Sequence, residues 1–140
     1  EDKGKNNCVF LSTNDKSRYQ IFLRNIPQKR QFLVFDLENF EEINDYDGFK
    51  IKISDMVGES SSLNIKDYFP ACPPTKVYLY KSDHVFDDYK NYSAPISLRI
   101  DLEDFKNNNP LINLEEISNI EFDFDKSIGQ ISLDNIGFAN

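Results

Sequence analysis

The sequence is poor in several residues that specialised folds and sites require. Its 140 residues include no tryptophan, one histidine, one methionine, two cysteines and five glycines. So few cysteines exclude a disulfide-rich scaffold, and so few glycines exclude a collagen-like chain or a flexible linker. No run approaches the roughly 18 apolar residues of a membrane-spanning helix. We therefore expect a globular chain that does not insert into a membrane.

Recognisable catalytic motifs are also missing. The chain has no Gly-x-Ser-x-Gly elbow, no glycine-rich phosphate loop, no His-Glu-x-x-His and no Cys-x-x-Cys pair. His84, beside Asp83, is a conceivable base for Cys8 or Cys72 as nucleophile, but an acid-rich loop is the simpler interpretation of that segment. No particular pair of carboxylates is positioned for glycoside hydrolysis. We expect a protein that is not an enzyme.

The charge balance excludes one class of partner. The chain carries 24 acidic and 16 basic residues, a formal net charge of −8. That charge repels phosphate backbones, so nucleic acid is a poor candidate. With 39% hydrophobic and 14% aromatic residues and no shift in composition, the chain is typical of one globular domain over residues 1–140. Because it does not begin with Met, we expect a mature form or a domain of a larger chain. We also expect a monomer.

The two cysteines leave their redox state open. Cys8 and Cys72 are far enough apart for a disulfide between them to close a long loop, which favours such a bond. Two buried free thiols are equally natural, because free cysteine behaves as a small apolar residue. The sequence does not decide between these alternatives.

Short runs of alternating apolar and polar residues dominate the chain. This period of two is typical of strands with one buried face, and no amphipathic helix of three or more turns separates them. The pattern predicts an all-β fold, an antiparallel β-sandwich of jelly-roll type. Short helical turns are expected at 102–106 and 114–117, and the longest loop at 56–75. The roughly eight expected strands are 8–12, 18–26, 32–37, 49–53, 77–80, 96–102, 120–125 and 131–138.

Tyrosines are the first candidate ligand contacts. Tyr78 and Tyr80 project from the same face of one expected strand. An exposed phenol can stack on the apolar face of a sugar and bond its hydroxyls. Tyrosines at alternating positions also commonly fill a half-buried sheet surface. The absence of tryptophan removes the largest stacking surface.

A carboxylate inside the last strand is the candidate metal ligand. Asp134 interrupts the otherwise apolar segment 131–138, so it requires either a ligand or a hydrogen-bond partner. Calcium is the natural cation, since it binds several oxygen ligands. Asp45 and Asp47 are explained more simply as turn residues. No twelve-residue EF-hand loop is present, so a calcium site would be assembled from distant segments.

Three passages carry a resemblance to a known family. Residues 32–53 run from an apolar strand through Asn44-Asp45-Tyr46-Asp47-Gly48 into a second strand. Residues 97–105 form a strand and short turn, and 117–124 with 131–138 form a pair of closing strands. These passages resemble carbohydrate-binding modules of the galactose-binding-like jelly-roll fold, and the related complex I assembly-factor domain. The resemblance spans about residues 31–138 and is weaker over 56–95. It reports the fold more strongly than the function.

The resemblance implies sites as well as a fold. Members of the family often hold a structural calcium ion near the chain ends, and Asp134 matches the aspartate of the terminal strand. They bind sugars on a concave sheet face or by loops at one end. The alternative for such a face is a solvated surface with cross-strand ion pairs. The candidate residues for a sugar-binding face are Lys50, Lys52, Tyr78, Tyr80, Arg99 and Asp101, with Glu121 and Asp123 beside them.

Together these observations predict a non-catalytic carbohydrate-binding or accessory module. It would belong to an extracytoplasmic protein, secreted or held at the cell surface or in the periplasm, and would bind a glycan in a groove or at a loop end of the sandwich. The competing hypothesis is a protein-interaction or scaffold sandwich without a sugar site. The lack of tryptophan and the many charges on the expected face favour the second hypothesis.

Overall fold

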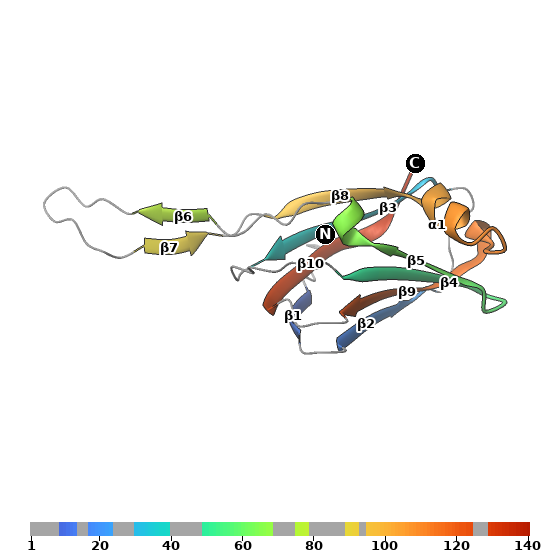
Figure 1. Ribbon diagram of the computed structural model, residues 1–140, viewed down its shortest axis with the longest axis horizontal. Coiled ribbons are helices and arrows are strands. Elements are labelled where there is room, and N and C mark those ends of the chain that lie inside the picture. Colours follow the sequence, from blue (N-terminus) through green and yellow to red (C-terminus); the bar gives the residue numbers. More distant parts are fainter. Residues whose placement is uncertain are drawn as a thin grey trace, which may run out of the picture.

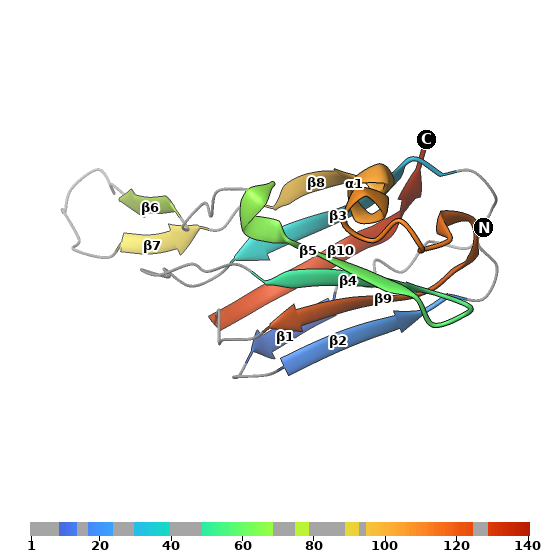
Figure 2. The ribbon, with the colours of Figure 1, turned by 45° about the vertical axis from the view of Figure 1, so that its right-hand side comes forward.

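The computed structural model describes residues 9–13, 17–23, 30–39, 49–68, 75–78, 89–92, 95–124 and 129–140. Their strands form two antiparallel four-stranded sheets and a separate two-stranded hairpin (Figure 1). The expected all-β antiparallel sandwich is therefore confirmed. In both views the hairpin projects beyond one end of the sandwich, and α1 (Leu102–Asn108) lies toward the other end (Figure 2).

Each sheet combines strands from distant parts of the chain. The first sheet has the order β1 (Val9–Thr13), β10 (Gly129–Ala139), β3 (Phe32–Asn39) and β8 (Ile96–Asp101). The second has the order β2 (Ser17–Phe22), β9 (Ile117–Phe124), β4 (Lys50–Asp55) and β5 (Ser60–Asn64). The hairpin pairs β6 (Thr75–Tyr78) with β7 (Tyr89–Tyr92), and two short 3₁₀ helices are η1 (Ile65–Asp67) and η2 (Leu114–Glu116).

Aromatic side chains join the two sheets in the core. The ring of Phe122 on β9 meets the ring of Phe35 on β3 edge to face, with centroids 5.5 Å apart. Phe49, which precedes β4, lies 6.1 Å from Phe122 and 4.9 Å from Phe124. All four are at most 2% exposed. These side chains come from both sheets. The apolar residues that alternate along the strands therefore meet in a single apolar layer between the sheets.

Helix α1 lies beside one edge of each sheet, since it packs against β5 and β8. Ser61 donates from its hydroxyl to the carbonyl of Phe105 (2.7 Å), and Asn108 donates from its amide to the carbonyl of Ser62 (2.8 Å). These bonds fasten the end of α1 to β5. The helix therefore protects part of a strand edge that would otherwise present unpaired backbone groups.

Several sequence predictions are confirmed and others are wrong. Helical turns do occupy 102–108 and 114–116. The segment 56–75, expected as a loop, contains β5 and η1, and β7 also occupies an expected loop. Serine-rich β5 does not show the alternation of apolar and polar residues that predicts a strand. Its register with β4 and its bonds to α1 hold it in place instead. The described residues thus form ten strands rather than eight.

Within the described ranges, no helix is long and apolar enough to span a bilayer.

The aromatic core gives a direct test of the packing. We expect Phe122→Ala to lower the free energy of unfolding by about 3–5 kcal/mol, because it removes the ring shared by both sheets and leaves a cavity. Phe22→Ala is the control, since Phe22 is 74% exposed on the neighbouring strand β2. It should change stability by less than about 0.5 kcal/mol. Urea unfolding measures both, and equal losses would contradict the assignment of Phe122 to the core.

Candidate functional site

Lys50 and Lys52 project from the outer face of the second sheet. Their strand β4 pairs with β9, so that Lys50 lies opposite Asp123 and Lys52 opposite Glu121. Glu121 also accepts a hydrogen bond from Gln20 on β2. Two neighbouring pairs of opposite charge therefore join β4 and β9, as expected for a surface stabilised by cross-strand pairs.

Arg99 and Asp101 lie on β8, in the first sheet. The guanidinium carbon of Arg99 is 3.6 Å from the ring centroid of Phe32, and the group donates to the carbonyl of Asn140 (3.3 Å). Asp101 caps α1 and accepts from the backbone N–H of Glu103 (2.9 Å). Both side chains thus already have structural partners.

The expected sugar-binding residues do not share one surface. Lys50 and Lys52 belong to one sheet, and Arg99 and Asp101 to the other. Tyr78 ends β6, in the hairpin outside the two main sheets (Figure 1), while Tyr80 lies outside the described residues. Contact between each candidate residue and a ligand stays a prediction. Because Lys50 and Lys52 lie on a different sheet from Arg99 and Asp101, these residues do not form one platform.

Asp134 lies at a β-bulge in β10. The register with β3 shifts between Asp134 and Gly137, and Asn135 has a positive φ of 50°. The backbone N–H of Asn135 donates to Asp134 (2.7 Å), and its side-chain amide donates to Asp36 (2.6 Å). Asp134 therefore has the hydrogen-bond partner that its position in the strand requires.

The bulge borders a recess of about 270 Å³ on the outer face of the first sheet. Hydrogen bonds from Asn135 and Ser97 hold the pKa of Asp36 below its usual value. Across the described ranges, no group of three or more His, Cys, Asp or Glu residues could hold a metal ion. Calcium binding by Asp134 stays a prediction. The recess is lined by Asp36, Glu38, Pro95, Ser132, Asp134 and Asn135.

The calcium prediction has a thermal test. If Asp134 binds calcium in the folded state only, millimolar calcium should raise the melting temperature of the protein by several degrees over its value in chelator. Asp134→Asn should abolish that increase because the amide lacks the negative charge. Identical melting temperatures of the unsubstituted protein in calcium and in chelator would contradict the prediction.

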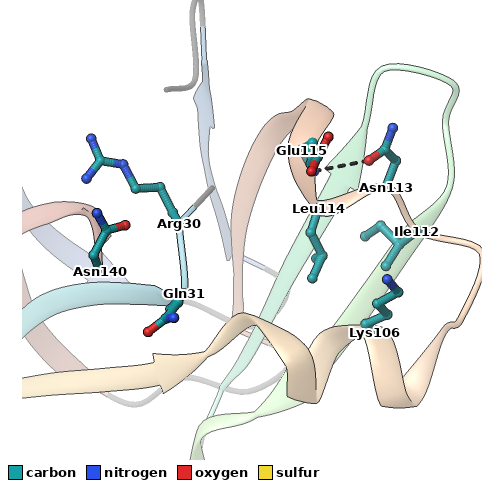
Figure 3. A pocket seen from close by; sticks show the side chains of 8 residues that line it. All are labelled: Arg30, Gln31, Lys106, Ile112, Asn113, Leu114, Glu115 and Asn140. Atoms are coloured by element: carbon teal, nitrogen blue, oxygen red, sulfur yellow. Dashed lines mark hydrogen bonds between the residues drawn. The ribbon is translucent and has the colours of Figure 1, made fainter. Parts of the chain in front are cut away.

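A larger cavity lies at the end of the sandwich that carries α1. Its volume is about 620 Å³, within the range of small-molecule sites. In Figure 3 one group of side chains belongs to the start of β3 and the end of β10, and the other to α1 and the segment that follows it. The first group comprises Arg30, Gln31 and Asn140, and the second Lys106, Ile112, Asn113, Leu114 and Glu115.

Backbone hydrogen bonds fix the first group of lining residues. The N–H of Gln31 donates to the carbonyl of Ala139 (3.0 Å), which ties the start of β3 to the end of β10. The carbonyl of Gln31 accepts from the N–H of Leu102 (2.8 Å), the first residue of α1. The start of β3, the chain end and the helix are thus joined beside the cavity.

A buried carboxylate fixes the second group. Asp55 is 3% exposed and accepts from the N–H groups of Val57 (3.0 Å), Glu59 (2.9 Å) and Asn113 (3.0 Å). Burial raises the pKa of Asp55, but these bonds and one from the N–H of Gly58 outweigh it, so the pKa lies below its ordinary value. The ionised carboxylate therefore ties the β4–β5 turn to a residue that lines the cavity.

Asn109 holds the turn between α1 and residues 112–115, which line the cavity. Its side-chain amide donates to the carbonyl of Ser60 (2.9 Å), and its side-chain oxygen accepts from the N–H of Leu111 (3.1 Å). Its backbone N–H donates to the carbonyl of Phe105 (3.0 Å). One asparagine therefore ends the helix and orients the chain toward Ile112.

None of the residues that line the cavity is predicted from the sequence to be functional. Arg30 and Gln31 follow a polar stretch, Lys106 lies in the last turn of a short helix, and Asn113 caps a 3₁₀ turn. Each has an ordinary structural role when taken alone. The only signal was the cluster of turn residues at 106–110, which locates a turn and not a cavity.

The role of Asp55 predicts how stability depends on pH. Because its folded pKa is lowered, its contribution is present above its unfolded pKa and is lost as the pH falls through the folded value, below about pH 4. At neutral pH, Asp55→Asn should lower the free energy of unfolding by on the order of 2 kcal/mol. The NH₂ group of the amide takes the place of one carboxylate oxygen and cannot accept a hydrogen bond. The loss of stability in acid should also become smaller than in the unsubstituted protein.

Urea unfolding at neutral pH and at about pH 3 measures both effects. Asp67→Asn is the control, since Asp67 is an exposed acid on η1. It should leave both the neutral stability and the loss in acid close to their original values. A variant at Asp55 that behaved like this control would contradict the proposed anchoring role.

The chain was compared with family models, curated proteins and solved structures, and none of the three comparisons gave a match.

Proposed function

We propose that this chain is a non-catalytic glycan-binding module of an extracytoplasmic protein, and that it binds a saccharide in the cavity beside α1. The observation that carries the proposal is the 620 Å³ cavity lined by amide and charged side chains at one end of the sandwich. Loop-end sites of this kind are also what the resemblance to galactose-binding-like modules implies. The proposed fold is a jelly roll of that type.

Strand order supports the jelly-roll part of the proposal. Strands β1, β2, β3 and β4 alternate between the two sheets, and so do β8, β9 and β10. Only β4 and β5, among consecutive strands of the two sheets, pair directly as a hairpin. Eight strands in two four-stranded sheets with repeated crossings are characteristic of jelly rolls.

The chemistry of the lining suits a polyhydroxylated ligand. Gln31, Asn113 and Asn140 offer amide donors and acceptors, which match hydroxyl groups on a sugar. Half-buried Leu114 adds aliphatic surface against which the C–H face of a ring can pack. Among the lining residues there is no aromatic side chain, so modest affinity is expected from hydrogen bonds and aliphatic contact.

A second candidate function is protein interaction, and exposed apolar side chains favour it. Met56 is 76%, Val57 81% and Leu111 74% exposed, and Phe22 is 74% exposed at the end of β2. Phe22 pairs with Asn119 on β9, whose other neighbour, Ser54, precedes the turn that carries Met56. Exposed apolar groups near one sheet end are typical of interaction surfaces.

A glycan array with the isolated chain separates the two candidates. Under the first, a saccharide binds, and the double variant Gln31→Ala with Lys106→Ala weakens its binding by roughly tenfold or more through lost hydrogen bonds. Asn107→Ala is the control, because Asn107 is exposed on the same helix and does not line the cavity. Calorimetry measures the affinities.

The other outcomes are equally informative. Binding lost on Tyr78→Ala with Tyr80→Ala, and retained by the cavity variant, would move the sugar site to the hairpin and contradict the cavity assignment. No binding to any saccharide would contradict the glycan function and favour protein interaction.

A further inference from the structure

Two cationic side chains line the cavity from its two groups of residues. Arg30 comes from the segment before β3, and Lys106 comes from α1 (Figure 3). Glu115 is the one acidic side chain among the lining residues. Two cations against one carboxylate leave the lining with a charge of +1, in a chain whose net charge is −8. The cavity is therefore locally opposite in charge to the protein as a whole.

Arg30 lacks the partners that the other described arginines have. Arg18 forms an ion pair with Asp123 (3.4 Å). Arg99 stacks on Phe32 and donates to a backbone carbonyl. The Nε of Arg30 is buried without a hydrogen-bond partner among the described residues. A buried donor left unpaired is costly, more so on a charged group, and such exceptions call for a physical explanation.

An anion in the cavity would give the guanidinium of Arg30 an acceptor, and a rotation of the side chain would expose the Nε, which has almost no accessible surface in this structure. A carboxylate or sulfate accepts hydrogen bonds from a guanidinium in a fixed planar geometry, and these charge-assisted bonds are stronger than neutral ones. The ammonium of Lys106 would add a second positive charge on the other side of the cavity. The neighbouring amides and aliphatic groups would then contact the uncharged part of the same ligand.

We infer that the cavity selects an acidic saccharide, one bearing a carboxylate or a sulfate, with Arg30 as the residue that recognises the charged group. The inference rests on the proposed glycan-binding function and narrows it to a ligand class. It also accounts for the positively charged lining of the cavity in an acidic chain.

The experiment uses matched ligands on the full chain. Tetragalacturonate is compared with its methyl ester, which keeps the sugar and removes the charge. A sulfated oligosaccharide of similar length separates sulfate from carboxylate recognition, and a neutral tetrasaccharide completes the set. Affinities are measured by calorimetry at low and at high salt, for the unsubstituted chain, Arg30→Gln and Arg18→Gln.

We expect at least one acidic ligand to bind roughly tenfold or more tightly than its neutral counterparts. Arg30→Gln should remove that preference while retaining weak binding of neutral sugar. Arg18→Gln makes the same chemical change on a distant sheet face and should keep the preference. High salt should weaken only the acidic ligand.

Three results would overturn the inference, in two distinguishable ways. Equal binding of acidic and neutral ligands, or a preference that survives Arg30→Gln, would contradict charge recognition and leave glycan binding intact. Absence of binding to every saccharide would contradict both this inference and the proposed function. Circular dichroism of each variant verifies that the fold is retained.

Discussion

One buried carboxylate links the sandwich to its candidate site. Asp55 ends β4, whose Ile51 and Ile53 lie in the core, and its two oxygens hold both its own turn and Asn113, far along the chain. The turn also requires Gly58, whose φ of 96° is favourable only for glycine. Together with the bonds of Asn109, this link fixes the segment that follows α1 over the end of the second sheet. The cavity therefore depends on a hydrogen-bonded charge as well as on apolar packing.

The periodicity of the sequence predicted most of the architecture because most inward side chains are apolar. Residues such as Phe35, Ile51 and Phe122 alternate with polar ones, and that alternation is sufficient to locate strands. Strand β5 escaped prediction because its inward residue is Ser61, whose hydroxyl is satisfied by a helix carbonyl. A buried serine of this kind has no signature in a hydrophobic pattern, since its partner is distant in the chain.

The candidate site was harder to predict than the fold. The alternation shows that the side chains of Lys52 and Arg99 point away from the core, but it does not show to which sheet each residue belongs. Strand pairing makes that assignment, and it placed the two residues on different sheets. The cavity poses the same difficulty, because Arg30 and Lys106 come to line one cavity only through the order of the strands and the position of α1. A single sequence carries no local mark of such a meeting.

The separate hairpin has a consequence for how the chain can vary. Strands β6 and β7 pair with each other and with no strand of either main sheet. A change in their sequence therefore disturbs no register of the sandwich, whereas a change in β3 or β10 alters a pairing on which the core depends. Insertions are tolerated best where few backbone bonds cross to the rest of a fold. Related chains are therefore expected to differ most in this hairpin while keeping the same sandwich.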